Sequence, residues 1–209
     1  METLTHISVI GLTGGIGSGK SVISRILRCN GKFVYDCDYE ANWLMTHDIT
    51  LKNELISILG SQAYNDDSSL NRKFISGKLF SDPEIRKSIN ISVHSAVKED
   101  ILKKINSSIN EFFIESAILA TSGLDSLCDK IWLITAPEEI RIERIRARDS
   151  LTFSEIRSRI ESQKEELALL PKSKIKEIKN DGKSPLLLKV LELTGFLNTL
   201  GFRWEPVYI

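Results

Sequence analysis

Two kinds of apolar pattern alternate along the chain. Short uninterrupted runs rich in β-branched and aromatic residues are typical of buried strands, and apolar residues three and four apart are typical of helices. The runs predict four strands, at residues 7–12, 32–35, 112–114 and 131–134. The helical spacing predicts helices over residues 20–28, 39–108, 137–148, from 154 onward, and 186–200.

The segment 174–179 fits neither pattern cleanly. Ile175 and Ile178 are three apart, which is a helical spacing, but the segment is short and is bounded by Pro171 and Gly182. Its own pattern leaves strand and helix open.

The order of the elements indicates an α/β fold. Strands that alternate with helices predict a mainly parallel sheet covered on both faces. The helical stretch 39–108 is too long for a simple crossover, so we expect a subdomain beside the sheet. A chain of 209 residues is long enough for one such domain and too short for two.

Composition narrows the possible partners. Lys plus Arg and Asp plus Glu are both 28, and a chain without a basic excess is not expected to bind nucleic acid. No apolar run approaches the roughly 18 residues of a membrane span, and the first residues show no leader pattern, so we expect no membrane association. Cys29, Cys37 and Cys128 have no metal or redox spacing, which indicates reduced thiols and a cytoplasmic location.

Residues 14–21 match the phosphate-binding pattern G-x-x-x-x-G-K-S/T. Small residues let backbone N–H groups converge on an anion, and the following helix adds the positive end of its dipole. A chance glycine-rich turn is disfavoured because a predicted strand precedes the motif and a predicted helix follows it. We expect Lys20 to reach the β- and γ-phosphates, Ser21 to ligate Mg²⁺ and the Val22 amide to face the α-phosphate. The expected ATP contacts in this motif are Gly15, Ile16, Gly17, Ser18, Gly19, Lys20, Ser21 and Val22.

Two other classes of phosphate-loop protein lack support in the sequence. A GTPase would carry N-K-x-D and D-x-x-G, and neither occurs. An ABC-type ATPase would have a hydrophobic strand ending in an acidic pair, whereas the third predicted strand ends in Glu115 alone. These observations favour a small-molecule kinase.

An acidic pair, Asp36 and Asp38, follows the second predicted strand. This end of a strand faces the ligand crevice in an open α/β sheet, and residues two apart on a strand point the same way. An acceptor hydroxyl needs a carboxylate that orients it and takes its proton, which suits Asp38, while Asp36 can act on Mg²⁺ through water. Alternatively, Asp38 is a cap for the next helix.

One predicted helix is crowded with cations: Arg141, Arg144, Arg146 and Arg148. Arg144 and Arg148 are four apart and share a face, from which they can neutralise charge on a transferring phosphoryl group. The segment 149–154 just after them can act as a lid. Alternatively, the helix is solvated and its arginines pair with neighbouring glutamates.

With these features placed, the sequence resembles the dephospho-coenzyme A kinase family. Residues 11–21 match the family's opening, residues 36–38 its D-A-D strand end with Cys in place of Ala, and residues 113–116 its L-L-F-E-S strand. One departure is Ser95, because the family usually has Pro after the position of His94. The other similar segments are residues 70–73, 79–82 and 89–94, 143–149 with Gln163, and 178–182.

The resemblance implies a P-loop kinase fold with a five-stranded parallel sheet flanked by helices, and it makes 174–179 the fifth strand. It also implies a helical substrate-binding subdomain and a lid. The expected boundaries are 1–38 and 111–200 for the core, 39–110 for the subdomain, and 141–165 for the lid region.

The implied activity is the ATP- and Mg²⁺-dependent phosphorylation of the ribose 3′-hydroxyl of dephospho-CoA, the last step of CoA synthesis. By matching position, Asp38 is the acceptor-side carboxylate, Arg144 and Arg148 are lid cations, and Asn180 and Gly182 lie near the adenine. Two alternatives stay open: another P-loop metabolite kinase acting on a nucleoside monophosphate or a small alcohol, and an ATP-binding regulatory protein. The oligomeric state does not follow from the sequence, and a monomer is favoured.

Overall fold

The computed structural model describes residues 7–108 and 111–199. Contacts among these residues divide the chain into two compact units. Unit 1 contains the described residues up to Val34 and from Glu111 onward, and unit 2 contains Tyr35 to Ser108. No helix within the described ranges is long and apolar enough to cross a membrane.

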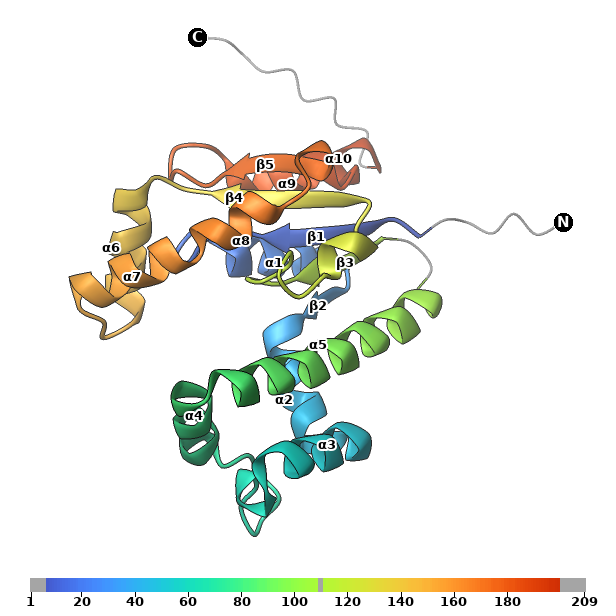
Figure 1. Cartoon of the computed structure of the whole chain (residues 1–209). Coiled ribbons are helices and arrows are strands. Elements are labelled where there is room, and N and C mark those ends of the chain that lie inside the picture. The colour runs from blue at the N-terminus through green and yellow to red at the C-terminus, as the bar shows by residue number, and fades with distance from the viewer. Residues whose placement is uncertain (1–6, 109–110, 200–209) are drawn as a thin grey trace, which may run out of the picture. The chain divides into compact units, whose positions relative to one another are not determined.

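The strands form one parallel sheet with the order β2-β3-β1-β4-β5, all of it in unit 1 except the last two residues of the edge strand β2 (Figure 1). The central strand β1 pairs in parallel with both neighbours, so that Gly11 lies opposite Ile114 on one side and Ile131 on the other. The predicted five-stranded parallel sheet is therefore confirmed. The strands are β1 (Val9–Thr13), β2 (Val34–Asp36), β3 (Phe112–Glu115), β4 (Lys130–Thr135) and β5 (Ile175–Lys179).

The fifth strand, implied only by the resemblance, is confirmed. β5 pairs in parallel with β4, and Ile178 lies opposite Ile134. Residues three apart on a strand point to opposite faces. Accordingly, Ile178 is fully buried and Ile175 is only half-buried, so their helical spacing was coincidental.

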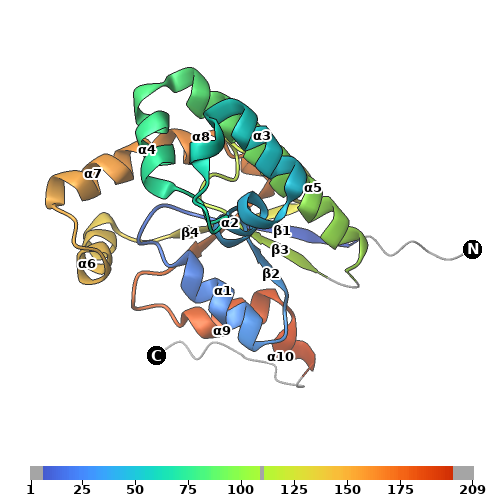
Figure 2. The same cartoon turned by 90° about the horizontal axis from the view of Figure 1, so that it is seen from below.

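Two helices, α1 (Lys20–Cys29) and α9 (Leu186–Leu193), pack together on one face of the sheet (Figure 2). Ile23 and Leu27 of α1 and Val190 of α9 join the apolar residues of the strands in one core. The single helix predicted over 186–200 is wrong. The segment forms two helices, α9 and α10 (Phe196–Thr199), which are separated at Gly195 with its left-handed φ of 69°. Residue 200 lies outside the described residues.

Three helices follow β4 in the chain: α6 (Glu138–Arg148), α7 (Phe153–Ser162) and α8 (Lys164–Leu169). The predicted break after Arg148 is confirmed. After the break, Thr152 caps the start of α7. Its side chain accepts the Glu155 N–H, and the Glu155 side chain accepts the Thr152 N–H, so two otherwise unpaired N–H groups are satisfied. Ile145, Ile156 and Ile160 form a small core that holds α6 against α7.

Unit 2 is helical, as predicted. Its helices are α2 (Cys37–His47), α3 (Ile49–Leu59), α4 (Arg72–Ser81) and α5 (Pro83–Asn106). Leu51 and Leu55 of α3 and Ile101 of α5 are buried where these helices contact one another. Asp48, Asn71 and Asp82 each accept a backbone N–H bond at the start of a helix, which fixes where α3, α4 and α5 begin.

Candidate phosphate-binding site

The phosphate-loop motif lies between β1 and α1, in the strand–loop–helix context that the sequence predicts. Gly17 and Gly19 have φ values of 77° and 100°, which side-chain-bearing residues rarely adopt. A Cβ atom on Gly19 would also overlap the side-chain amide of Asn180, and one on Gly17 would lie 2.7 Å from the Arg141 carbonyl oxygen. Glycine is therefore required at both positions by backbone conformation and by close approach.

Side chains from α6 and from the end of β5 hold the carbonyl groups of the loop. The Nδ2 of Asn180 donates to the Ser18 carbonyl at 2.8 Å. Arg144 donates through Nη1 to the Gly17 and Ser18 carbonyls at 3.3 and 3.4 Å, and through Nη2 to the Asn180 carbonyl at 3.0 Å. In a trans peptide the N–H points away from the C=O of the same unit. These bonds to the Ser18 carbonyl therefore turn the Gly19 N–H in the opposite direction, where an anion can accept it.

Three of the amides that we expect on ATP are engaged within the protein. The Ile16 N–H donates to Oε1 of Gln163 at 2.6 Å, the Ser18 N–H donates to the Gly15 carbonyl at 3.0 Å, and the Val22 N–H donates to the Gly19 carbonyl at 3.1 Å. A phosphate contact from any of them would have to share its donor. The Nζ of Lys20 donates to the Gly14 carbonyl at 2.7 Å, which places the ammonium group at the loop.

The arginines of α6 divide into two groups. Arg141 and Arg144 donate to loop carbonyls, so the solvated-helix alternative is wrong for these two. Burial lowers the pKa of the Arg141 guanidinium, against an opposing effect of Glu138. Arg148 forms an ion pair with Asp149 at 2.9 Å and its side chain is 64% exposed; the hydrogen bond to Asp149 raises its pKa. Arg144 and Arg148 are thus not brought to the same partner, and their expected action on a phosphoryl group stays a prediction.

The acidic pair is divided between the end of a strand and the start of a helix. β2 ends at Asp36, and Asp38 lies in the first turn of α2. The argument that both carboxylates point the same way is wrong, because the two-residue period holds only on a strand. The capping alternative for Asp38 is also wrong, since Oδ1 of Asp36 accepts the Tyr39 N–H at 3.1 Å and is the cap.

A metal ion at this site would depend on the nucleotide for most of its ligands. No cluster of three or more His, Cys, Asp or Glu side chains occurs within residues 7–108 and 111–199. Mg²⁺ usually keeps several waters and binds one or two protein groups together with substrate phosphates. The hydroxyl of Ser21, which is exposed on the first turn of α1, fits that pattern.

Comparisons with known proteins agree with this geometry. Residues 8–185 match the family model described as dephospho-CoA kinase. The dephospho-CoA kinase of Porphyromonas gingivalis is 41% identical over 161 residues, which cover 77% of this chain and 79% of that protein. The chain belongs to the dephospho-CoA kinase family. Membership of a kinase family with a phosphate loop implies the use of ATP.

Solved structures support the same fold. The crystal structure of TT1252 from Thermus thermophilus is 28% identical, with a TM-score of 0.73 and coverage of 94% of this chain and 99% of that one. The dephospho-CoA kinase from Campylobacter jejuni is 20% identical, with a TM-score of 0.64 and coverage of 93% and 98%. At 20% identity, the similarity to the Campylobacter jejuni structure supports the fold alone.

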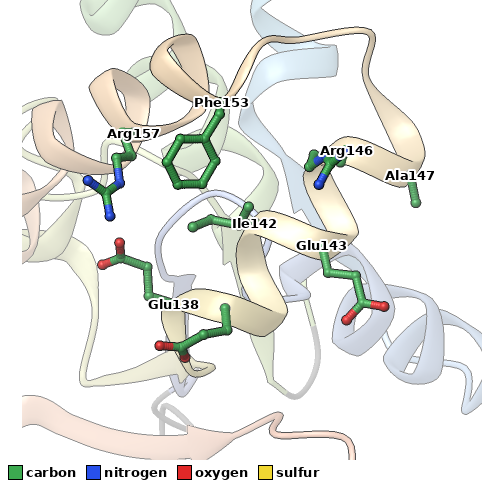
Figure 3. A pocket seen from close by; sticks show the side chains of 8 residues that line it. Glu138, Ile142, Glu143, Arg146, Ala147, Phe153 and Arg157 are labelled. Carbon is green, nitrogen blue, oxygen red and sulfur yellow. The ribbon is translucent and has the colours of Figure 1, made fainter.

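A cavity of about 590 Å³ lies beside α6 and α7 (Figure 3). Its lining carries both charges, with Glu138 and Glu143 from α6 and Arg157 from α7, whose guanidinium lies 4.8 Å from the centre of the Phe153 ring. No residue of the phosphate loop lines this cavity. It is therefore separate from the nucleotide site expected in a dephospho-CoA kinase.

Sequence reasoning missed the contacts of Arg141 and Gln163 with Ile16. Gln163 is 147 positions from Ile16, and no local pattern indicates such a contact. The only available signal was that Gln163 belongs to the segment that resembles the lid of the dephospho-CoA kinase family.

Proposed function

We propose that the chain transfers the γ-phosphoryl group of ATP to the ribose 3′-hydroxyl of dephospho-CoA, giving CoA and ADP. The observation that carries the proposal is the phosphate loop braced by Arg144 and Asn180, in a chain whose family match runs from residue 8 to residue 185. A loop braced from outside keeps its amide groups in position before the nucleotide arrives, and preorganised donors are the main source of catalysis in phosphoryl transfer.

In the proposed reaction the 3′-oxygen forms a bond to the γ-phosphorus while the bond from that phosphorus to the bridging oxygen of ADP breaks. Asp38 orients the 3′-hydroxyl and accepts its proton. Lys20 binds the β- and γ-phosphates, and Arg144 and Arg148 face the charge that develops on the transferred group. Mg²⁺, held by Ser21 and through water by Asp36, would supply further neutralising charge.

Asn180 and Gly182 are proposed to lie near the adenine of ATP. Asp181, between them, accepts the N–H groups of Lys183 and Ser184, which fixes the turn that follows β5. Such a turn can present backbone groups to a base without a dedicated side chain.

Unit 2 is proposed as the acceptor-binding subdomain, with residues 141–165 of unit 1 as the lid. Within unit 2, Asn42 links the proposed base to a cation: its Nδ2 donates to the Asp38 carbonyl at 2.7 Å, and its Oδ1 accepts from Nη2 of Arg72 at 3.0 Å. A carboxylate for the hydroxyl and an exposed guanidinium for the diphosphate suit an acceptor that carries both groups. The protein is further proposed to be a monomer that acts in the cytoplasm.

The test is the rate of ADP release from ATP with a panel of acceptors, with product mass confirming the added phosphoryl group. We expect turnover with dephospho-CoA and little with AMP, adenosine or shikimate, because binding energy from the diphosphate and the pantetheine arm contributes to kcat. Comparable turnover of AMP would instead support the alternative of another metabolite kinase.

Arg72→Leu examines the acceptor side separately. We expect a raised KM for dephospho-CoA and an unchanged KM for ATP, with Lys73→Leu, an exposed neighbour, as the control. Equal effects of the two substitutions would contradict the role given to Arg72.

A further inference from the structure

The peptide groups on both sides of Ile16 are held by side chains from outside the phosphate loop. Oε1 of Gln163, at the end of α7, accepts the Ile16 N–H at 2.6 Å. Nε of Arg141, on α6, donates to the Ile16 carbonyl at 2.8 Å. Both side chains are partly buried, so these bonds are shielded from competing water.

The side chain of Ile16 is anchored as well. It packs against the small core of Ile145, Ile156 and Ile160 between α6 and α7. Ile16 is therefore fixed at its N–H, its C=O and its side chain by the two helices that follow β4.

These anchors fix the direction of a neighbouring amide. The Ile16 carbonyl and the Gly17 N–H belong to one planar trans peptide and point in opposite directions. Because Arg141 holds the carbonyl on the α6 side, the Gly17 N–H is directed away from α6. Gly17 has a left-handed φ of 77°, and a glycine backbone can adopt many other conformations. The bond from Arg141 to the Ile16 carbonyl therefore restricts the orientation of the Gly17 N–H.

We propose that Gln163 and Arg141 are positioning residues that clasp Ile16, hold the Gly17 amide in its ATP-binding direction and couple the phosphate loop to helices α6 and α7. The inference rests on the proposed function for its kinetic readout. It assigns the two side chains a role in nucleotide affinity although neither needs to touch the reacting atoms.

The experiment uses the full chain with substitutions at Gln163 and Arg141, singly and combined. Gln163→Met removes the acceptor at similar size, and Gln163→Glu keeps an acceptor oxygen. Arg141→Met removes the donor, Arg141→Gln keeps an N–H donor without the charge, and Arg141→Lys keeps a charged donor. Arg25→Met is the matched control, because Arg25 is an exposed arginine on α1 that lies outside the lid and makes no contact with Ile16 in the structure.

We expect Gln163→Met and Arg141→Met each to raise the KM for ATP and the Kd for ADP about fivefold to tenfold, the range for loss of one hydrogen bond. The KM for dephospho-CoA should stay within about twofold in these variants, and the Arg25→Met control should leave both KM values within about twofold. Gln163→Glu and Arg141→Gln should recover most of the ADP affinity. The double Met variant should lose less than the product of the single losses, since both act on one residue.

Hydrogen exchange of the Ile16 amide gives a readout that does not depend on activity. Protection should fall in Gln163→Met and return in Gln163→Glu. Wild-type ADP affinity in Gln163→Met would overturn the clasp, and so would tighter ADP binding, which would show that Gln163 withholds the Ile16 N–H from phosphate. Equal increases in both KM values with a matching drop in melting temperature would also overturn it. Recovery in Arg141→Lys but not in Arg141→Gln would show that charge on the nucleotide, rather than the bond to Ile16, is what Arg141 supplies, and would overturn its positioning role.

Failure of the proposed function gives a different pattern. Wild-type protein that binds ADP but does not phosphorylate dephospho-CoA would refute the proposed function. The ADP affinities and the Ile16 exchange rates of the variants would still decide the clasp.

Discussion

Asn180→Ala separates two roles for Asn180, which the family resemblance implies to lie near the adenine and which the structure places against the phosphate loop. The substitution removes the 2.8 Å bond from Nδ2 to the Ser18 carbonyl and the 3.4 Å contact between Oδ1 and Arg144. The bond from Arg144 to the Asn180 backbone carbonyl, at 3.0 Å, can persist. The Ser18 carbonyl then has only the 3.4 Å contact with Arg144 in place of a close donor.

The size of the effect follows from these bonds. Asn180 is 8% exposed, so its amide bond forms largely out of water. Losing one such bond, with a weak replacement at its acceptor, costs about 1.5 kcal/mol. For a chain of this length that corresponds to a fall in melting temperature of roughly 3 to 6 °C. If the same free energy holds the loop in its binding form, the affinity for ADP falls about tenfold.

The assay is thermal unfolding together with calorimetric titration of ADP and GDP, with Lys179→Ala, an exposed neighbour, as the control. Bracing of the loop predicts a lower melting temperature and equal relative losses of ADP and GDP affinity, because the loop contacts phosphates common to both. A loss confined to ADP at an unchanged melting temperature would refute this reasoning and restore the adenine contact.

Three further predictions test other parts of the account. Glu166, which is 4% exposed, accepts the N–H groups of Ala120 and Thr121 at 2.6 and 2.9 Å, so Glu166→Gln should cost about 2 kcal/mol in a urea unfolding experiment; an unchanged midpoint would contradict this. Burial lowers the pKa of His94 below 6.5, so its contribution to stability is complete above pH 6.5 and is lost as pH falls from there through the folded pKa. His94→Gln should flatten the dependence of the unfolding free energy on pH below pH 6.5. An unaltered curve would refute the lowered pKa of His94. Asp38→Asn should lower kcat strongly without changing ADP affinity or melting temperature, whereas full activity with lower stability would make Asp38 structural.

The phosphate loop was predictable because the residues that its chemistry requires are consecutive in the sequence. Gly19 must be glycine, and Lys20 must follow it, so local sequence carries the site. The strands β1, β3 and β4 were equally accessible, since each is a short apolar run.

Long-range contacts were not predictable in this way. The hydrogen bond from Ile16 to Gln163 depends on where α7 ends and on the packing of Ile156 and Ile160. Neither feature leaves a recognisable pattern in the residues around Ile16 or Gln163. β5 was ambiguous for a related reason: most of its residues are exposed or half-buried, so burial did not impose a clear period of two.

The placement of Asp38 failed for a physical reason of its own. The strand period was extended two residues too far, although Asp36 is a strong capping residue that can start a helix at Cys37. A capping residue directly after a short apolar run thus competes with continuation of the strand.

The most direct test of the central claim is the identity of the product formed from ATP and dephospho-CoA. The wild-type chain should convert dephospho-CoA to a product with one added phosphoryl group, which phosphorus NMR places on the ribose 3′-oxygen, together with one equivalent of ADP. Lys20→Ala, which removes the ammonium group at the phosphate loop, should form almost none. ADP without a phosphorylated acceptor, phosphate at another position, or an equal yield from Lys20→Ala would contradict the account.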